Sequence, residues 1–193
     1  MLGIVVISMG SLTTLSACRG FHPGTANPPE FFDEGTGNTL SVASKPLVFA
    51  RDRTDVAAFA RDYVTLVAVE VDHSGDFANY LLLYRWSTVD RRMSPPPNDE
   101  SGELKIFAQG RVLDLRPLDA VPVSLTKGAA LHVPAHEETV THAYRVDTDV
   151  LRFIATSDTL GVQLPQEPLD TPFRMWEDGR AALQEFLRKT ASP

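Results

Sequence analysis

The stretch YVTLVAVEVDHSGDFANYLLLYRWSTVD, residues 63–90, decides the fold. Residues 63–72 and 79–90 are rich in β-branched, leucine and aromatic residues, which favour extended strands. Between them, the segment HSGD at 73–76 contains the Ser and Gly that a tight turn requires. The pattern predicts a long antiparallel hairpin around which the rest of the chain is arranged.

Shorter segments on both sides extend this sheet. Strands are expected at LVFA (47–50), THAYRV (141–146) and LGVQL (160–164). Gln109-Gly110 lies between two apolar runs, which is the pattern of a second hairpin closed by a two-residue turn.

Helical periodicity appears in three places. Thr54 is a candidate N-cap for a short helix in the segment TDVAAFARD (54–62). Asp147 and Asp149 are candidate caps for a second helix, which has Val150, Leu151 and Ile154 on one face. A third helix is expected over residues 175–189, with one apolar face made by Trp176, Leu183, Phe186 and Leu187. The predicted class is α+β: a mostly antiparallel sheet with two or three helices packed on one face.

The composition excludes some classes of partner. The chain has 193 residues with 25 acidic and 18 basic side chains, a net charge of −7. A nucleic-acid or anionic-lipid partner needs a basic face, so neither is expected. With one cysteine, Cys18, the chain cannot form an internal disulfide or a multi-cysteine metal site.

The residues that precede Cys18 indicate a role for this cysteine. Residues 2–9, LGIVVISM, form an uncharged apolar run that is too short to span a bilayer. Leu15, Ser16 and Ala17 then precede Cys18, and this arrangement resembles the lipobox of bacterial lipoprotein precursors. Such signals normally begin with a basic segment, whereas no Lys or Arg precedes Arg19 here.

The resemblance implies cleavage before Cys18 and a lipid on its sulfur, so that the membrane becomes a partner through the anchor. Arg19 in the second mature position favours the outer membrane, facing the periplasm, over the inner membrane. The expected organisation is a signal peptide at 1–17, a lipidated cysteine and flexible tether at 18–45, and one globular domain at 46–193.

Two groups of residues are candidates for ligand or metal binding. Trp86 with Arg91 and Arg92 offers an aromatic ring and two guanidinium groups at a strand end, which suits a small ligand. His132, His136 and His142, with two glutamates at 137 and 138, have donor atoms that zinc accepts, although Pro134 breaks a shared helix face.

Catalytic motifs receive little support. A Ser-x-x-Lys match at Ser124–Lys127 lacks the other motifs of the penicillin-binding family, and no catalytic residue or cofactor is expected. The sequence therefore favours a lipid-anchored envelope protein with a periplasm-facing interaction or assembly domain and an envelope protein as partner. A metal-dependent hydrolase using residues 132–142 and a small-ligand-binding lipoprotein are the alternatives.

Overall fold

The computed structural model describes residues 29–88, 102–125, 140–164 and 172–190. These residues form a ten-stranded sheet in which every pairing is antiparallel, together with two helices of nine and eleven residues. Residues 123–125 are also helical. The elements in chain order are β1 (Glu30–Asp33), β2 (Asn38–Val42), β3 (Leu47–Asp52), β4 (Arg61–His73), β5 (Asp76–Ser87), β6 (Leu104–Ala108), β7 (Arg111–Leu115), β8 (Val140–Val146), α2 (Thr148–Thr156), β9 (Leu160–Gln163), β10 (Phe173–Glu177) and α3 (Arg180–Thr190). The mostly antiparallel sheet is confirmed, and it dominates the fold more than the sequence predicts.

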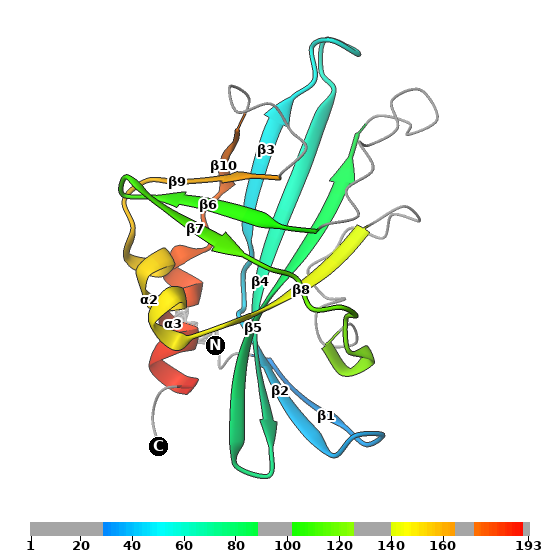
Figure 1. Cartoon of the computed structure of the whole chain (residues 1–193), viewed down its shortest axis with the longest axis vertical. Coiled ribbons are helices and arrows are strands. Elements are labelled where there is room, and N and C mark those ends of the chain that lie inside the picture. The colour runs from blue at the N-terminus through cyan, green and yellow to red at the C-terminus, as the bar shows by residue number, and fades with distance from the viewer. Residues whose placement is uncertain (1–28, 89–101, 126–139, 165–171, 191–193) are drawn as a thin grey trace, which may run out of the picture.

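The β4–β5 hairpin is the spine of the molecule (Figure 1). It pairs without a break from Asp62 opposite Ser87 to His73 opposite Asp76. Ser74 and Gly75 make the turn with φ values of 55° and 97°, which is the left-handed conformation that suits a two-residue hairpin. The hairpin predicted at 63–90 is thus confirmed.

The sheet divides at β4 because this strand is long enough to hold two partners along one edge. Residues 61–66 pair with β3, and residues 69–72 pair with β2. From β3 the sheet continues through β10, β9 and β6 to β7, whereas β5 pairs with β8 on the other side. In Figure 1, β6, β7 and β9 run across the hairpin rather than along it.

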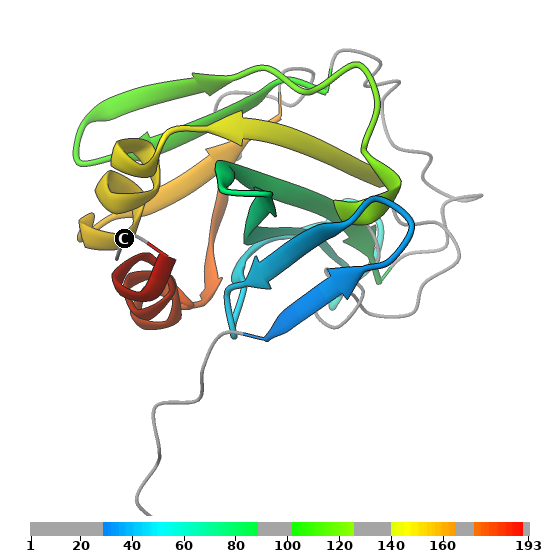
Figure 2. The same ribbon diagram turned by 90° about the horizontal axis from the view of Figure 1, so that it is seen from below.

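The two ends of this path approach each other. The Leu118 N–H, three residues after β7, donates to the Ala143 carbonyl of β8 at 2.8 Å. The Tyr144 hydroxyl of β8 donates to the Gly102 carbonyl, just before β6, at 2.6 Å. The sheet therefore curls around one main core, and α2 and α3 lie side by side at one side of it (Figure 2).

Both faces of the hairpin are buried, which explains its nearly continuous apolar run. Alternate residues of β4 and β5 enter the main core inside the curl, where they meet both helices: Val64, Leu66, Ala68, Leu81 and Leu83. The residues between them face a second core, which β1, β2 and residues 118–125 cover: Val67, Val69, Leu82 and Tyr84.

Several shorter predictions are also confirmed. β3, β8 and β9 lie where strands are expected, and α2 buries Leu151 and Ile154. Gln109 and Gly110, with φ values of 49° and 75°, close the β6–β7 hairpin.

The predicted domain start at Pro46 is wrong, because strands occur within the segment interpreted as a tether. β1 and β2 form a hairpin at residues 30–42, and β2 pairs with the second half of β4. Leu40 and Val42 are almost fully buried in the second core. The folded domain therefore includes residues 30–45, while Cys18 lies outside the described residues.

Residues 53–60, which the structure describes, do not form the helix predicted to begin at Thr54. The residues between β3 and β4 form turns in which the Arg53 carbonyl accepts hydrogen bonds from the Val56 and Ala57 N–H groups. Phe59, expected on a buried helical face, is 92% exposed. The short segment therefore connects β3 to β4 through turns.

The last predicted helix starts five residues later than expected. Residues 173–177 form β10, which pairs with β3, and α3 begins at Arg180. Gly179 lies so close to Pro46 that a Cβ atom would approach the Pro46 carbonyl oxygen to 2.2 Å. Phe186 is buried as predicted, but Trp176 belongs to a strand and faces solvent.

Candidate functional site

Trp86 lies near the end of β5, directly opposite Tyr63 of β4. The two rings are stacked, with 4.0 Å between their centroids and 7° between their planes. The indole Nε1 of Trp86 also donates to Thr65 Oγ1 at 3.3 Å. These contacts fix both side chains on the outer face of the curled sheet.

A third ring extends this arrangement across two more strands. Ala50 of β3 pairs with Tyr63 on one side and with Arg174 of β10 on the other. Its small side chain leaves room for Trp176 to meet Tyr63 edge-to-face, with 6.2 Å between centroids and 80° between planes. We call Trp86, Tyr63 and Trp176 the aromatic row.

A cation completes the row. The Arg61 guanidinium lies over the Trp176 ring at 4.4 Å from its centroid, which is within cation–π range. The same group donates from Nε to the Asp52 carboxylate at 2.7 Å. Trp176 is 51% exposed, so the row presents apolar area next to a charged donor.

A network of charged groups anchors this end of the sheet from the opposite face of β4. Asp62 is buried and accepts hydrogen bonds from Arg51 at 2.8 Å and from Arg53 at 3.0 Å. Burial alone would raise the pKa of Asp62, but hydrogen bonds from Arg51, Ser87 and Arg53 outweigh it and lower the pKa. The Arg51 guanidinium also lies over the Phe173 ring at 4.6 Å.

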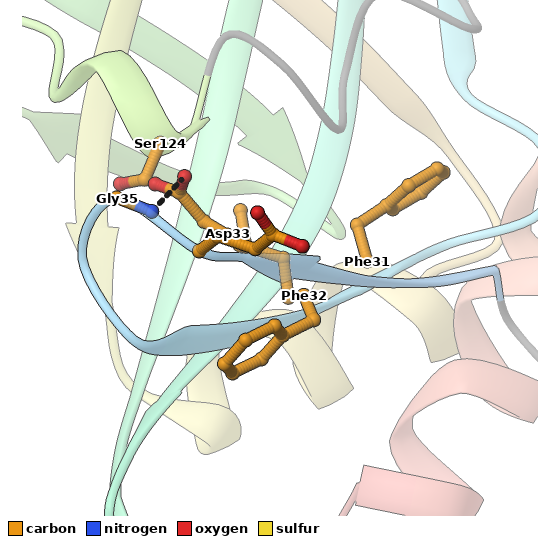
Figure 3. A pocket seen from close by; sticks show the side chains of 7 residues that line it. Phe31, Phe32, Asp33, Gly35 and Ser124 are labelled. Carbon is orange, nitrogen blue, oxygen red and sulfur yellow. Dashed lines mark hydrogen bonds between the residues drawn. The ribbon is translucent and has the colours of Figure 1, made fainter.

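A shallow pocket of about 460 Å³ lies at the β1–β2 hairpin, lined by Phe31, Phe32, Asp33, Glu34, Gly35, Leu40 and Ser124 (Figure 3). Asp33 accepts hydrogen bonds from the Gly35 N–H at 3.2 Å and the Thr36 hydroxyl at 2.8 Å. This carboxylate therefore shapes the turn. Ser124, the first residue of the Ser-x-x-Lys match, is buried here, and Lys127 lies outside the described residues.

The structure describes only some of the residues of the two predicted sites. Trp86 belongs to the aromatic row, but Arg91 and Arg92 lie outside the described residues, as do His132 and His136. His142 lies in β8 against Gly102, where a Cβ atom would come within 2.6 Å of its Nδ1. Among the described residues no three His, Cys, Asp or Glu side chains gather as a metal site. The zinc site stays a prediction that metal analysis of the purified protein tests.

Sequence reasoning missed Tyr63, Trp176 and Arg61 as members of a site. Their proximity depends on the register between strands from distant parts of the chain, and the helical spacing around Trp176 pointed to the core. The aromatic row offers contact area and a cation rather than a nucleophile paired with a base. The arrangement is therefore suited to binding.

In the part of the chain that the structure describes, no helix has the length and apolar character needed to cross a bilayer. Comparisons with protein-family models, with curated proteins and with solved structures found no match to this chain.

Proposed function

We propose that this chain is a lipid-anchored bacterial envelope protein, attached through Cys18 and facing the periplasm from the outer membrane. In this proposal its domain binds an envelope protein through the aromatic row. The observation that carries the proposal is the set of contacting rings formed by the buried Tyr63, the partly buried Trp86 and the 51% exposed Trp176, with Arg61 beside them.

The composition of the row supports a protein partner. Trp, Tyr and Arg are the residues most enriched among those that dominate binding energy at protein interfaces. The stacked rings are held in place before binding, so little side-chain entropy is lost on association. Burying the exposed half of an indole, roughly 100 Å², contributes about 2.5 kcal/mol at 25 cal/mol per Å².

The lipid anchor is supported by the lipobox resemblance and by the charge of the chain. A net charge of −7 gives little electrostatic attraction to anionic lipids, so membrane attachment needs the acyl chains. We expect Cys18→Ala to abolish labelling by radioactive palmitate and to leave the protein in the aqueous phase on detergent partition. Both versions are expressed with a basic segment upstream of Leu2, and labelling of the Cys18→Ala protein would exclude this anchor.

The binding face is tested with two exposed aromatic residues, Trp176 of β10 in the aromatic row and Phe77 of β5 near the β4–β5 turn. We expect Trp176→Ala to weaken partner binding about 10- to 100-fold, because the residue lies in the row. Phe77→Ala removes a ring that is 62% exposed near the β4–β5 turn and should leave binding unchanged. The partner is first recovered by crosslinking the intact lipoprotein, and affinities are then measured with purified proteins. Equal loss in both variants would contradict the assignment of this face.

A further inference from the structure

Glu70 is a mostly buried residue of β4 near the β4–β5 turn. It is 8% exposed and lies directly opposite Ser41 of β2 on one side and Asn79 of β5 on the other. Within the described residues, no hydrogen bond or ion pair to the Glu70 carboxyl group is found. An ionised carboxylate in such a place loses much of its hydration and gains no hydrogen bond or ion pair in return.

Asn79, directly opposite Glu70, has a side-chain oxygen without a hydrogen-bond donor in the part of the chain that the structure describes. Its Nδ2 donates to Thr148 Oγ1, at the start of α2, at 3.1 Å. Its Oδ1 is buried, and no donor among the described residues bonds to it. Directly opposed residues of an antiparallel pair have Cβ atoms about 4.5–5.5 Å apart, so the Glu70 carboxyl lies within reach of this acceptor. A neutral carboxyl has the O–H donor that Asn79 lacks.

We propose that Glu70 and Asn79 form a pH-sensitive latch, in which the protonated Glu70 carboxyl donates to Asn79 Oδ1 and loss of that proton releases the contact. The latch joins four elements, because Glu70 lies between β2 and β5 and Asn79 is bonded to α2. It lies at the end of the hairpin away from the aromatic row and does not depend on the proposed partner.

The charged surroundings favour the proton. Asp72 is on the same face of β4, two residues further along. Asp147 and Asp149 flank Thr148, and Asp149 is paired with Arg152. The neighbours from β2, β5 and β8, which are Ser41, Asn79 and Val146, carry no charge.

The basic side chains near the end of α3 form ion pairs with a residue other than Glu70. The basic groups near the end of α3, Arg188 and Lys189, are paired with Glu185 of the same helix at 2.6 and 3.0 Å. Burial, with a smaller contribution from the Asp72 carboxylate, raises the pKa of Glu70 to about 7.

The direction of the effect follows from this shift. Between the ordinary pKa of 4.5 and about 7, the folded protein holds a proton that the unfolded chain has released. Stability from the latch is therefore present at low pH and declines as the pH rises through about 7. Above that value a carboxylate lies beside an amide oxygen, and β2 and β5 separate more readily from β4.

The test is a carboxyl titration by NMR of the folded protein, with ¹³C-labelled glutamate, from pH 4 to 9. One resonance should titrate near pH 7 and disappear in Glu70→Gln, whose amide N–H replaces the carboxyl donor at every pH. Amide exchange at Ser41 and Asn79, corrected for its intrinsic pH dependence, should rise about tenfold between pH 6 and 8 in the wild type. It should stay constant in Glu70→Gln, whereas the control Glu177→Gln should match the wild type.

Two results would overturn the latch. A Glu70 midpoint at or below 4.5 would mean that Asn79 donates its amide to the ionised carboxylate. A pH-dependent rise in exchange that persists in Glu70→Gln would assign the effect to another group. If Glu70→Gln fails to fold, the wild-type titration decides by itself.

Discussion

Replacing Phe186 with alanine is expected to lower the free energy of unfolding by about 3–5 kcal/mol. Phe186 is 1% exposed and lies in the main core, where α3 packs against α2 and the inside of the curled sheet. Neighbouring elements are fixed by strand pairing, so the cavity cannot collapse without strain. Urea unfolding followed by circular dichroism measures the change.

Trp176→Ala is the matched control for this experiment, because it removes a larger ring from the surface. The expected loss is about 1 kcal/mol, from the edge contact with Tyr63 and the cation–π contact with Arg61. A larger loss at Trp176 than at Phe186 would mean that residues 175–189 form the buried helix that the spacing predicts, and that β10 is misplaced.

Asp62→Ala is expected to cost about 3–5 kcal/mol, because it removes one partner of a buried ion pair. The Arg51 and Asp62 side chains are each only 9% exposed, and Arg51 would keep its charge without this carboxylate. Since the folded pKa of Asp62 is lowered, the stabilisation is present at neutral pH. It is lost as the pH falls below the unfolded value of 3.8 and through the lower folded value.

Asp55→Ala provides the control, because Asp55 binds Arg53, another member of the network, from an exposed position. Its removal should cost far less than the removal of Asp62, since exposed ion pairs contribute little. Thermal unfolding of both variants at pH 7 and pH 3 gives the comparison. A loss at Asp62 no larger than at Asp55, or one that is the same at both pH values, would contradict the buried network.

The sequence was most informative where local pattern and tertiary environment agree. Residues 63–90 carry strand propensity, a turn signal and enough apolar residues to be buried on both faces, so the hairpin could be predicted without knowing its neighbours. The turn at Gln109-Gly110 could be predicted in the same way, because a two-residue hairpin turn requires left-handed residues.

The β1–β2 hairpin could not be recognised by the same reasoning. Its strands are four and five residues long and lie among Pro, Gly and Asn, a composition typical of a flexible segment. These residues become strands because the second half of β4 extends beyond β3 and leaves an edge for β2 to pair with. Such stabilisation comes from tertiary pairing, which is not visible in local composition.

Of the residues in the aromatic row, only Trp86 was identified from the sequence as a site residue. The aromatic row is assembled from three strands, and Trp176 meets Tyr63 because β10 pairs with β3 in one particular register. Residues 175–189 have an apolar spacing that fits a helix, and only the alternation within β10 places Phe173 inside and Trp176 outside.

We propose that the outer face around the aromatic row contacts an envelope protein, and photo-crosslinking in living cells tests this contact. A benzophenone amino acid is placed at Arg174, an exposed residue on the face of the row, or at Phe77, at the far end of the hairpin. We expect one discrete crosslinked envelope protein from position 174, which disappears in Trp176→Ala, and no such product from position 77. A product of equal yield from both positions, or one from position 174 that persists without Trp176, would contradict it.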